Sequence, residues 1–156
     1  MGATPTMCLT ENLEGVTEIR PGNYIFFDQF QNSLGSCSAD QIVVSVLTTV
    51  IGAYPQHNTL LVDAGALAMS KDPGATRPEN PGYGVVKGHP QLKLSSLSQE
   101  HGKITSDRPI DFQNLSIGTR LRIVPNHSCV TAALFDRYHV VENSRVVAEW
   151  EPVRGW

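Results

Sequence analysis

The sequence has no long apolar run, no surplus of positive charge and no cysteine-rich framework, and each absence removes a class of protein. Its apolar stretches fall short of the roughly 18–20 residues that a helix needs to cross a bilayer. Its 12 basic and 15 acidic residues are scattered and give a net charge of −3. Such a balance offers no electrostatic footprint for nucleic acid or anionic lipid. We therefore expect neither a nucleic-acid partner nor a membrane partner.

The cysteines are too few and too isolated to form a disulfide framework. Cys8, Cys37 and Cys129 make up neither an even set nor a CxxC pair. The first residues lack the basic and apolar segments of a secretory signal. Both observations predict reduced thiols and a cytoplasmic location. The start also matches a myristoylation pattern through Gly2 and Thr6, but this short pattern often arises by chance.

Short β-prone segments separated by turn residues dominate the chain, and ten prolines and thirteen glycines punctuate them. Val, Ile, Thr and aromatic residues, which suit a pleated surface, concentrate in these segments. The segments expected as strands are 23–27, 41–53, 60–62, 92–97, 103–105, 120–124, 138–141 and 145–150. Six to eight short strands predict a mainly β fold, an antiparallel β-barrel-like domain, with a sandwich as the alternative.

Two non-strand segments are also predicted. Residues 128–135 form the one good helical candidate, because Ala132, Ala133 and Leu134 favour helix. Residues 71–82 (KDPGATRPENPG) are predicted to form a loop from their composition.

The segment Pro125-Asn126-His127-Ser128-Cys129 holds the sharpest candidate site. Side chains two residues apart in an extended or turn conformation can point the same way, so His127 and Cys129 could share one ion. Nitrogen plus thiolate suits Zn²⁺, and two protein ligands leave positions for water or substrate, as in catalytic sites. A buried cysteine beside a hydrogen-bonded histidine is the structural alternative.

Two weaker features accompany this pair. Gly2, Ala3 and Thr4 offer small side chains and backbone N–H groups that can cradle a phosphate, although chain starts are commonly unstructured. Glu100 and His101 lie at an expected hairpin tip, where His101 either faces substrate or simply bonds within the turn.

Taken in order, several motifs resemble one family. These are GATPT at 2–6, EIRPGNYIFFD at 18–28, VDAGALAMSKD at 62–72, GYG at 82–84, LSQEHG at 97–102 and PNHSC at 125–129. Together they are similar to the C-terminal part of D-serine dehydratases and D-threonine aldolases. Those are metal-activated enzymes of the alanine-racemase fold type.

The resemblance implies specific roles for the candidate residues. The family's H-x-C motif binds Zn²⁺ and falls on His127 and Cys129. Aldolases are described with H-x-D, so Cys129 favours the dehydratase side. The family's small-residue loop beside the pyridoxal phosphate group falls on Gly2, Ala3 and Thr4. Its E-H-G segment near the active site falls on Glu100 and His101, with no role carried over.

The resemblance also implies a missing part. These enzymes have an N-terminal (β/α)₈ barrel whose lysine holds pyridoxal phosphate, and Lys71, Lys87, Lys93 and Lys103 stand in none of that context. We expect residues 1–17 to be a remnant of the last loop or helix of that barrel, and residues 18–156 to be the β-domain. The complete enzyme would be a homodimer that converts a small D-amino acid, D-serine, to pyruvate and ammonia, and the β-domain alone would be inactive.

Three alternatives remain open at this point. The chain could be a non-catalytic binding or regulatory module, or the corresponding half of a D-threonine aldolase-type lyase. It could also be a self-contained metallohydrolase that uses His127, Cys129 and a third ligand such as His101.

Overall fold

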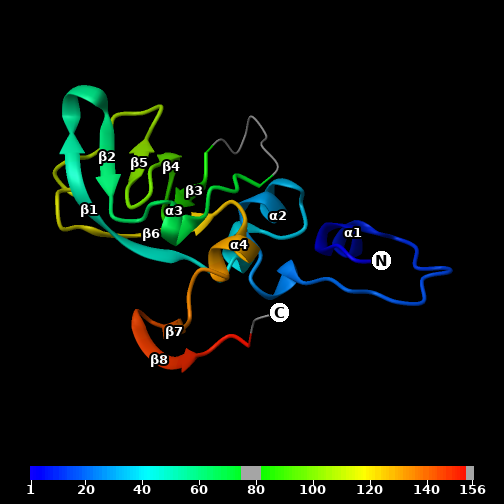
Figure 1. Ribbon diagram of the computed structural model, residues 1–156. Helices are drawn as coiled ribbons and strands as arrows, with labels where there is room; N and C mark the ends of the chain where they lie inside the picture. The colour runs from blue at the N-terminus through cyan, green and yellow to red at the C-terminus, as the bar shows by residue number, and fades with distance from the viewer. Residues whose placement is uncertain (75–81, 154–156) are drawn as a thin grey trace.

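The fold is built around a closed six-stranded antiparallel barrel. The computed structural model describes residues 1–74 and 82–153. The barrel strands are β1 (Val46–Tyr54), β2 (Thr59–Val62), β3 (Gly84–Val86), β4 (His89–Leu97), β5 (Gly102–Thr105) and β6 (Arg120–Pro125). They are hydrogen-bonded in the order β1-β2-β5-β4-β3-β6, and β6 closes the barrel against β1 (Figure 1). The predicted mainly β, barrel-like fold is confirmed, and the sandwich is not formed.

Alternation along the strands explains why the barrel closes. Along β1 the buried positions Val46, Thr48 and Val50 alternate with more exposed ones, which matches the two-residue repeat of a strand. Neighbouring strands contribute further fully buried side chains, Leu60, Val62, Leu94, Ile104 and Ile123. Each such side chain contributes about 1.5–3 kcal/mol through burial. The barrel interior is therefore a packed core rather than a channel.

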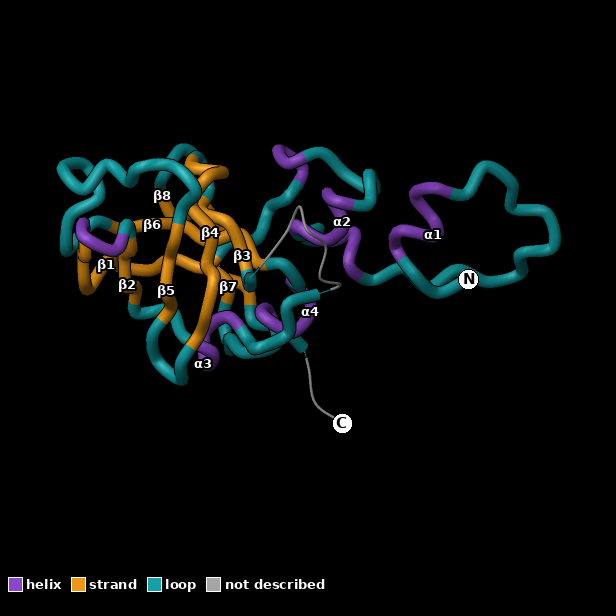
Figure 2. Tube along the Cα trace, turned by 90° about the horizontal axis from the view of Figure 1, so that it is seen from above, coloured by secondary structure: helices purple, strands orange, loops and turns teal. Residues whose placement is uncertain are grey.

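Short helices and one hairpin lie outside the barrel. The helices are α1 (Thr4–Leu9), α2 (Gln29–Ser33), α3 (Ala66–Met69) and α4 (Ser128–Ala132), with 3-10 turns at Asn23–Ile25, Ala39–Gln41 and Pro55–His57. Strands β7 (Tyr138–Glu142) and β8 (Arg145–Trp150) form a separate two-stranded sheet. In both views α1 and the barrel lie at opposite ends, with α2 and α4 between them (Figures 1 and 2). None of the helices in the described ranges has the length and apolar character to span a membrane.

Most predicted strands are present, and the differences have local causes. Residues 23–27 do not form a strand. Asn23–Ile25 is a 3-10 turn, and the Asn23 carbonyl accepts hydrogen bonds from the backbone N–H groups of Phe26 and Phe27. The strand expected from residue 41 begins only at Val46, after a 3-10 turn with a capping box at Ser38. Strand β3 was not predicted, because it has only three residues.

Three smaller predictions have different outcomes. The predicted helix at 128–135 is confirmed but ends at Ala132. Of the predicted loop at 71–82, residues 75–81 lie outside the described residues. The idea of an unstructured start was wrong, because the Met1 ammonium donates to the Glu18 carbonyl at 2.7 Å and Thr4 is buried. The chain returns beside its own start, which ties the first residues down.

Asp63, just after β2, links two strands through its carboxylate. Its Oδ1 accepts hydrogen bonds from the Thr48 hydroxyl at 2.5 Å and from the Thr49 backbone N–H at 2.8 Å. Desolvation acts to raise the pKa of Asp63, but the hydrogen bonds from Thr48 and Thr49 outweigh it and hold that pKa below its ordinary value. The folded state therefore favours the carboxylate form.

We predict that Asp63→Asn lowers the free energy of unfolding by about 0.5–1 kcal/mol at pH 7, since it weakens two charge-assisted bonds at an exposed position. Because the folded pKa lies below the unfolded one, the stabilisation is present above the unfolded pKa and is lost as the pH falls through the folded pKa. Urea denaturation at neutral and acidic pH measures both. A difference between the two proteins that stays constant down to acidic pH would contradict this assignment.

Candidate metal and ligand site

A single cavity of about 610 Å³ brings together segments that are far apart in the sequence. The start of the chain, the 3-10 turn at Asn23–Ile25, α2, the loop after α3 and the residues after β6 all contribute to its wall. The side chains and glycines used below that line it are Gly2, Ala3, Thr4, Arg20, Asn23, Asp72, Gly74, His127 and Cys129. The two predicted metal ligands and the three predicted phosphate-loop residues therefore share one cavity.

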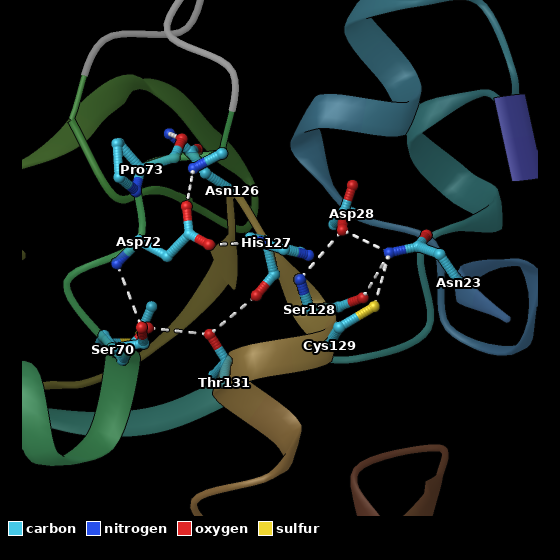
Figure 3. Close-up of polar contacts among 12 residues, drawn as sticks. Asn23, Asp28, Ser70, Asp72, Pro73, Asn126, His127, Ser128, Cys129 and Thr131 are labelled. Atoms are coloured by element: carbon cyan, nitrogen blue, oxygen red, sulfur yellow. Dashed lines mark hydrogen bonds and ion pairs between the residues drawn. The ribbon is translucent and has the colours of Figure 1, made fainter. Parts of the chain in front are cut away.

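His127 is oriented by a carboxylate from a distant loop. Its Nδ1 lies 2.8 Å from Oδ2 of Asp72, and both side chains are partly exposed (Figure 3). The other oxygen of Asp72 accepts the Gly74 backbone N–H at 2.8 Å, and the Asp72 backbone N–H donates to the Ser70 hydroxyl. With Nδ1 engaged in this way, Nε2 is the ring nitrogen left available to a ligand.

Cys129 lies in the first turn of α4 and is exposed. Its Sγ is 3.4 Å from the side-chain amide nitrogen of Asn23, and it hydrogen-bonds with His127. Figure 3 shows His127 between Asp72 on one side and Asn23, Asp28 and Cys129 on the other. One nitrogen donor and one sulfur donor thus face the same cavity.

Mutual hydrogen bonding shifts the pKa values of both side chains of this pair. The hydrogen bond with Cys129 raises the pKa of His127 to about 9, against partial burial and with help from Asp72. The same hydrogen bond from His127 lowers the pKa of Cys129, with a further contribution from Asn23. The hydrogen bond from the Gly74 backbone N–H lowers the pKa of Asp72, and the hydrogen bond with His127 lowers it further. The thiolate is the form of cysteine that binds metal.

Asn126, at the end of β6, holds the loop that carries Asp72. It is fully buried, and its Nδ2 donates to the carbonyls of Pro73 at 3.1 Å and Gly82 at 2.8 Å. Its backbone N–H donates to the Tyr83 carbonyl, and its own carbonyl accepts the Phe30 N–H. This one residue therefore ties β6 to both described ends of the 73–82 connection and to α2.

The other predicted site residues separate into two groups. Thr4 is buried beside the cavity, and its hydroxyl accepts the Tyr24 backbone N–H at 3.2 Å, which fixes the start of the chain against the 3-10 turn at Asn23–Ile25. Glu100 and His101 instead lie exposed in the β4–β5 turn, packed against Gly65, and are not among the residues that line the cavity. The structure does not bring them to the His127–Cys129 pair.

Four residues that matter for the site were missed by sequence reasoning. They are Asn23, Asp28, Asp72 and Asn126. All four lie within the motifs that carry the family resemblance, Asn23 and Asp28 in 18–28 and Asp72 at the end of 62–72. The only signal was their presence in those motifs, because their spacing has no recognisable period.

The comparisons with known proteins establish the family. The profile of the family described as "Putative serine dehydratase domain" matches residues 43–141. D-serine dehydratase of Dictyostelium discoideum is 44% identical to this chain in a match that covers all of this chain. The chain belongs to the D-serine dehydratase-like family. It spans 42% of the Dictyostelium enzyme, and so about two fifths of the length of the relatives of this kind.

Solved structures agree with the observed fold. D-threo-3-hydroxyaspartate dehydratase from Delftia sp. is 40% identical, with a TM-score of 0.89 over 99% of this chain and 44% of that one. Structures of that enzyme include a histidine-to-alanine variant and a cysteine-to-alanine variant, the latter in a metal-free form. An alanine-racemase-like protein from Idiomarina loihiensis is 38% identical, also with a TM-score of 0.89, over 99% of this chain and 43% of that one.

One relative is matched by this chain over nearly all of its own length. An uncharacterized protein of Mycobacterium tuberculosis is 31% identical over 127 residues, which cover 80% of this chain and 92% of that protein.

We predict that Asn126→Ala lowers the free energy of unfolding by about 1–3 kcal/mol, because it leaves the partly buried carbonyls of Pro73 and Gly82 without their donor. Asn114→Ala is the matched control, since Asn114 is exposed and donates only to the nearby Asp111 carboxylate. Urea denaturation of both variants measures the difference. Equal effects of the two substitutions would show that Asn126 does not hold this loop.

Proposed function

We propose that this chain provides the Zn²⁺-binding side of a D-serine dehydratase-like active site that also uses pyridoxal phosphate. The observation that supports it most is the shared cavity, in which His127 and Cys129 face Gly2, Ala3 and Thr4. A dehydratase that acts on a small hydroxy amino acid needs its metal and its cofactor phosphate to be bound in the same cavity.

The donor set fits a zinc-class ion. Imidazole nitrogen and thiolate are the ligands that Zn²⁺ prefers, and a carboxylate on the far ring nitrogen is the usual support of a metal-binding histidine. The Asp72–Nδ1 contact leaves Nε2 of His127 as the metal-binding atom. The Delftia variants support the pair, because the histidine and cysteine replaced there are two positions apart, as His127 and Cys129 are. Bound Zn²⁺ would supply Lewis acidity that stabilises negative charge on a departing hydroxyl group.

The start of the chain fits a phosphate group. Gly2, Ala3 and Thr4 line the cavity with Arg20, and the Tyr24 N–H fixes the position of the Thr4 hydroxyl. Pyridoxal phosphate supplies an electron sink for carbanion chemistry. In this proposal Asp72 holds the proton of His127 at Nδ1, and Gly2 to Thr4 hold the phosphate end of the cofactor.

The lysine of the cofactor site would come from elsewhere. Of the described residues that line the cavity, none is a lysine. We therefore propose that the partner is a (β/α)₈ barrel domain, in the same chain or in a second chain of a homodimer. The substrate is a small D-amino acid, D-serine, and the reaction takes place in the cytoplasm. The dehydratase assignment rests on Cys129 and on the two dehydratases at 39–44% identity.

A second candidate function has one specific observation in its favour. The shorter mycobacterial relative is covered over 92% of its length by a match to this chain. Proteins of about the size of this domain therefore occur in the family, as expected for a non-catalytic binding or regulatory module. Zinc binding together with turnover on addition of a barrel domain distinguishes the first function from this one.

The self-contained metallohydrolase finds less support. His101, its suggested third ligand, lies in the β4–β5 turn outside the cavity. Within residues 1–74 and 82–153 no three His, Cys, Asp or Glu side chains are grouped to hold a metal ion. An ion at His127 and Cys129 would take its other ligands from water, substrate or another domain.

We predict that the purified chain binds about one equivalent of Zn²⁺, and that His127→Ala and Cys129→Ala each reduce the affinity at least about tenfold, because each removes one of two protein ligands. Competition with a chromophoric chelator measures the affinity. Cys37→Ala is the matched control, since Cys37 is a free cysteine outside the cavity. Unchanged zinc binding in both site variants would refute the assignment.

We also predict that the chain alone, with Zn²⁺ and pyridoxal phosphate added, releases no pyruvate from D-serine above a protein-free blank. Adding the N-terminal part of the Dictyostelium enzyme should restore pyruvate release, provided that the two parts assemble. Cys129→Ala should abolish the restored activity. Cofactor-dependent pyruvate from the chain alone would overturn the proposed need for a barrel domain.

A further inference from the structure

The Asn23 side chain makes three contacts next to the candidate metal pair. Its Nδ2 lies 2.7 Å from Oδ2 of Asp28, 3.0 Å from Oγ of Ser128 and 3.4 Å from Sγ of Cys129 (Figure 3). An amide has two N–H donors, so one points to the Asp28 carboxylate and the other is shared by the hydroxyl and the sulfur. Asn23 thus joins the 3-10 turn at Asn23–Ile25 to the first turn of α4, 105 residues away in the chain.

The carboxylate of Asp28 holds both Asn23 and Ser128 in place. Asp28 is fully buried, its Oδ1 accepts the Gln31 backbone N–H at 2.8 Å, and its Oδ2 accepts the Ser128 backbone N–H at 2.9 Å. Burial of a carboxylate is unfavourable unless donors surround it, and with Asn23 three N–H groups do so. One carboxylate therefore fixes the residue before Cys129 and the amide that contacts its sulfur.

The orientation of the Asn23 amide follows from its neighbours. Rotating the amide by half a turn would put Oδ1 against the Asp28 carboxylate and the Cys129 sulfur, two acceptors. In the observed orientation Oδ1 is buried without a partner among the described residues. An unpaired buried acceptor is unfavourable, and it is tolerated here because both donors of the amide are engaged.

We propose that Asn23, held by Asp28, is a positioning residue for the Cys129 sulfur. Its amide donates a hydrogen bond to Sγ and thereby fixes the rotamer of the Cys129 side chain. The inference rests on the proposed metal site for its functional meaning. Neither Asn23 nor Asp28 is assigned as a ligand of the metal.

The first test uses the metal-free chain, so that it is independent of the metal. Scalar couplings measured by NMR report the χ1 rotamer of Cys129. We expect a single rotamer in the unmodified chain and rotamer averaging in Asn23→Ala. Asn32→Ala is the matched control, because the Asn32 amide donates to the Cys37 carbonyl at 2.9 Å and does not line the cavity.

The second test uses Co²⁺ as a spectroscopic probe of the metal–sulfur bond. We expect Asn23→Ala to weaken Co²⁺ binding about tenfold, the lower range for loss of a group that supports a metal ligand, and to reduce the thiolate-to-cobalt charge-transfer band. Asn32→Ala should leave both unchanged. If Asn23→Ala does not fold, Asn23→Ser replaces it, because a hydroxyl keeps one donor for Asp28 and lacks the second for Sγ.

The outcomes separate this inference from the proposed function. Rotamer averaging without Co²⁺ binding by the unmodified chain would refute the metal site and leave the positioning role standing. A fixed Cys129 rotamer with unchanged Co²⁺ affinity in the Asn23 variant would overturn the positioning role and leave the metal site standing.

Discussion

Closure of the barrel by β6 is the constraint on which the site depends. β6 pairs with β1 through Val46–Ile123 and its neighbours, and with β3 through Gly84–Pro125 and its neighbours. β6 is thus paired along both edges, and its last residue, Pro125, is paired with Gly84 of β3. The chain then passes at once into Asn126, His127 and Ser128, so the candidate ligands follow directly on a paired strand end.

Acidic and sulfur-bearing side chains surround the His127 imidazole. Asp72 and Cys129 line the cavity with it, and the buried Asp28 lies against the neighbouring Ser128. A proton on His127 partly balances their charge, as the raised pKa of this imidazole indicates. A divalent ion at Nε2 and Sγ would replace that proton and satisfy the same electrostatic demand. Binding would therefore release a proton, as expected where a metal competes with a protonated ligand.

The strands were predictable from the sequence to the extent that their side chains alternate. β6 and the β4–β5 hairpin were located by alternation and turn residues, since burial of one face decides their structure. The exposed β7–β8 hairpin was located by its turn residues. Residues 23–27 have the composition of a strand but form a turn. There the local hydrogen bonds of Asn23 and the buried Asp28 outweigh β propensity, and neither contact is visible in a local pattern.

The candidate site was predictable only in part, for a related reason. His127 and Cys129 are close in sequence, so their spacing is informative, and the family motif names them. Asp72 contacts His127 across 55 positions, and Asn23 contacts Cys129 across 106. Long-range pairs of this kind depend on barrel closure and on the hydrogen bonds of Asn126 to Pro73 and Gly82. No spacing rule could have found them.

The two ligands are held by separate networks, and this separation has a consequence for their energetics. Asp72 and the loop tied down by Asn126 fix His127 from one side. Asp28 and Asn23 fix Cys129 from the other, through α2 and the 3-10 turn at Asn23–Ile25. The networks meet at the His127–Cys129 hydrogen bond, at the short backbone that joins these residues and at the backbone hydrogen bond from Phe30 to Asn126. Substitutions in different networks should therefore have nearly additive effects on folding. Their effects on the proposed metal binding should couple, because one ion would contact both His127 and Cys129.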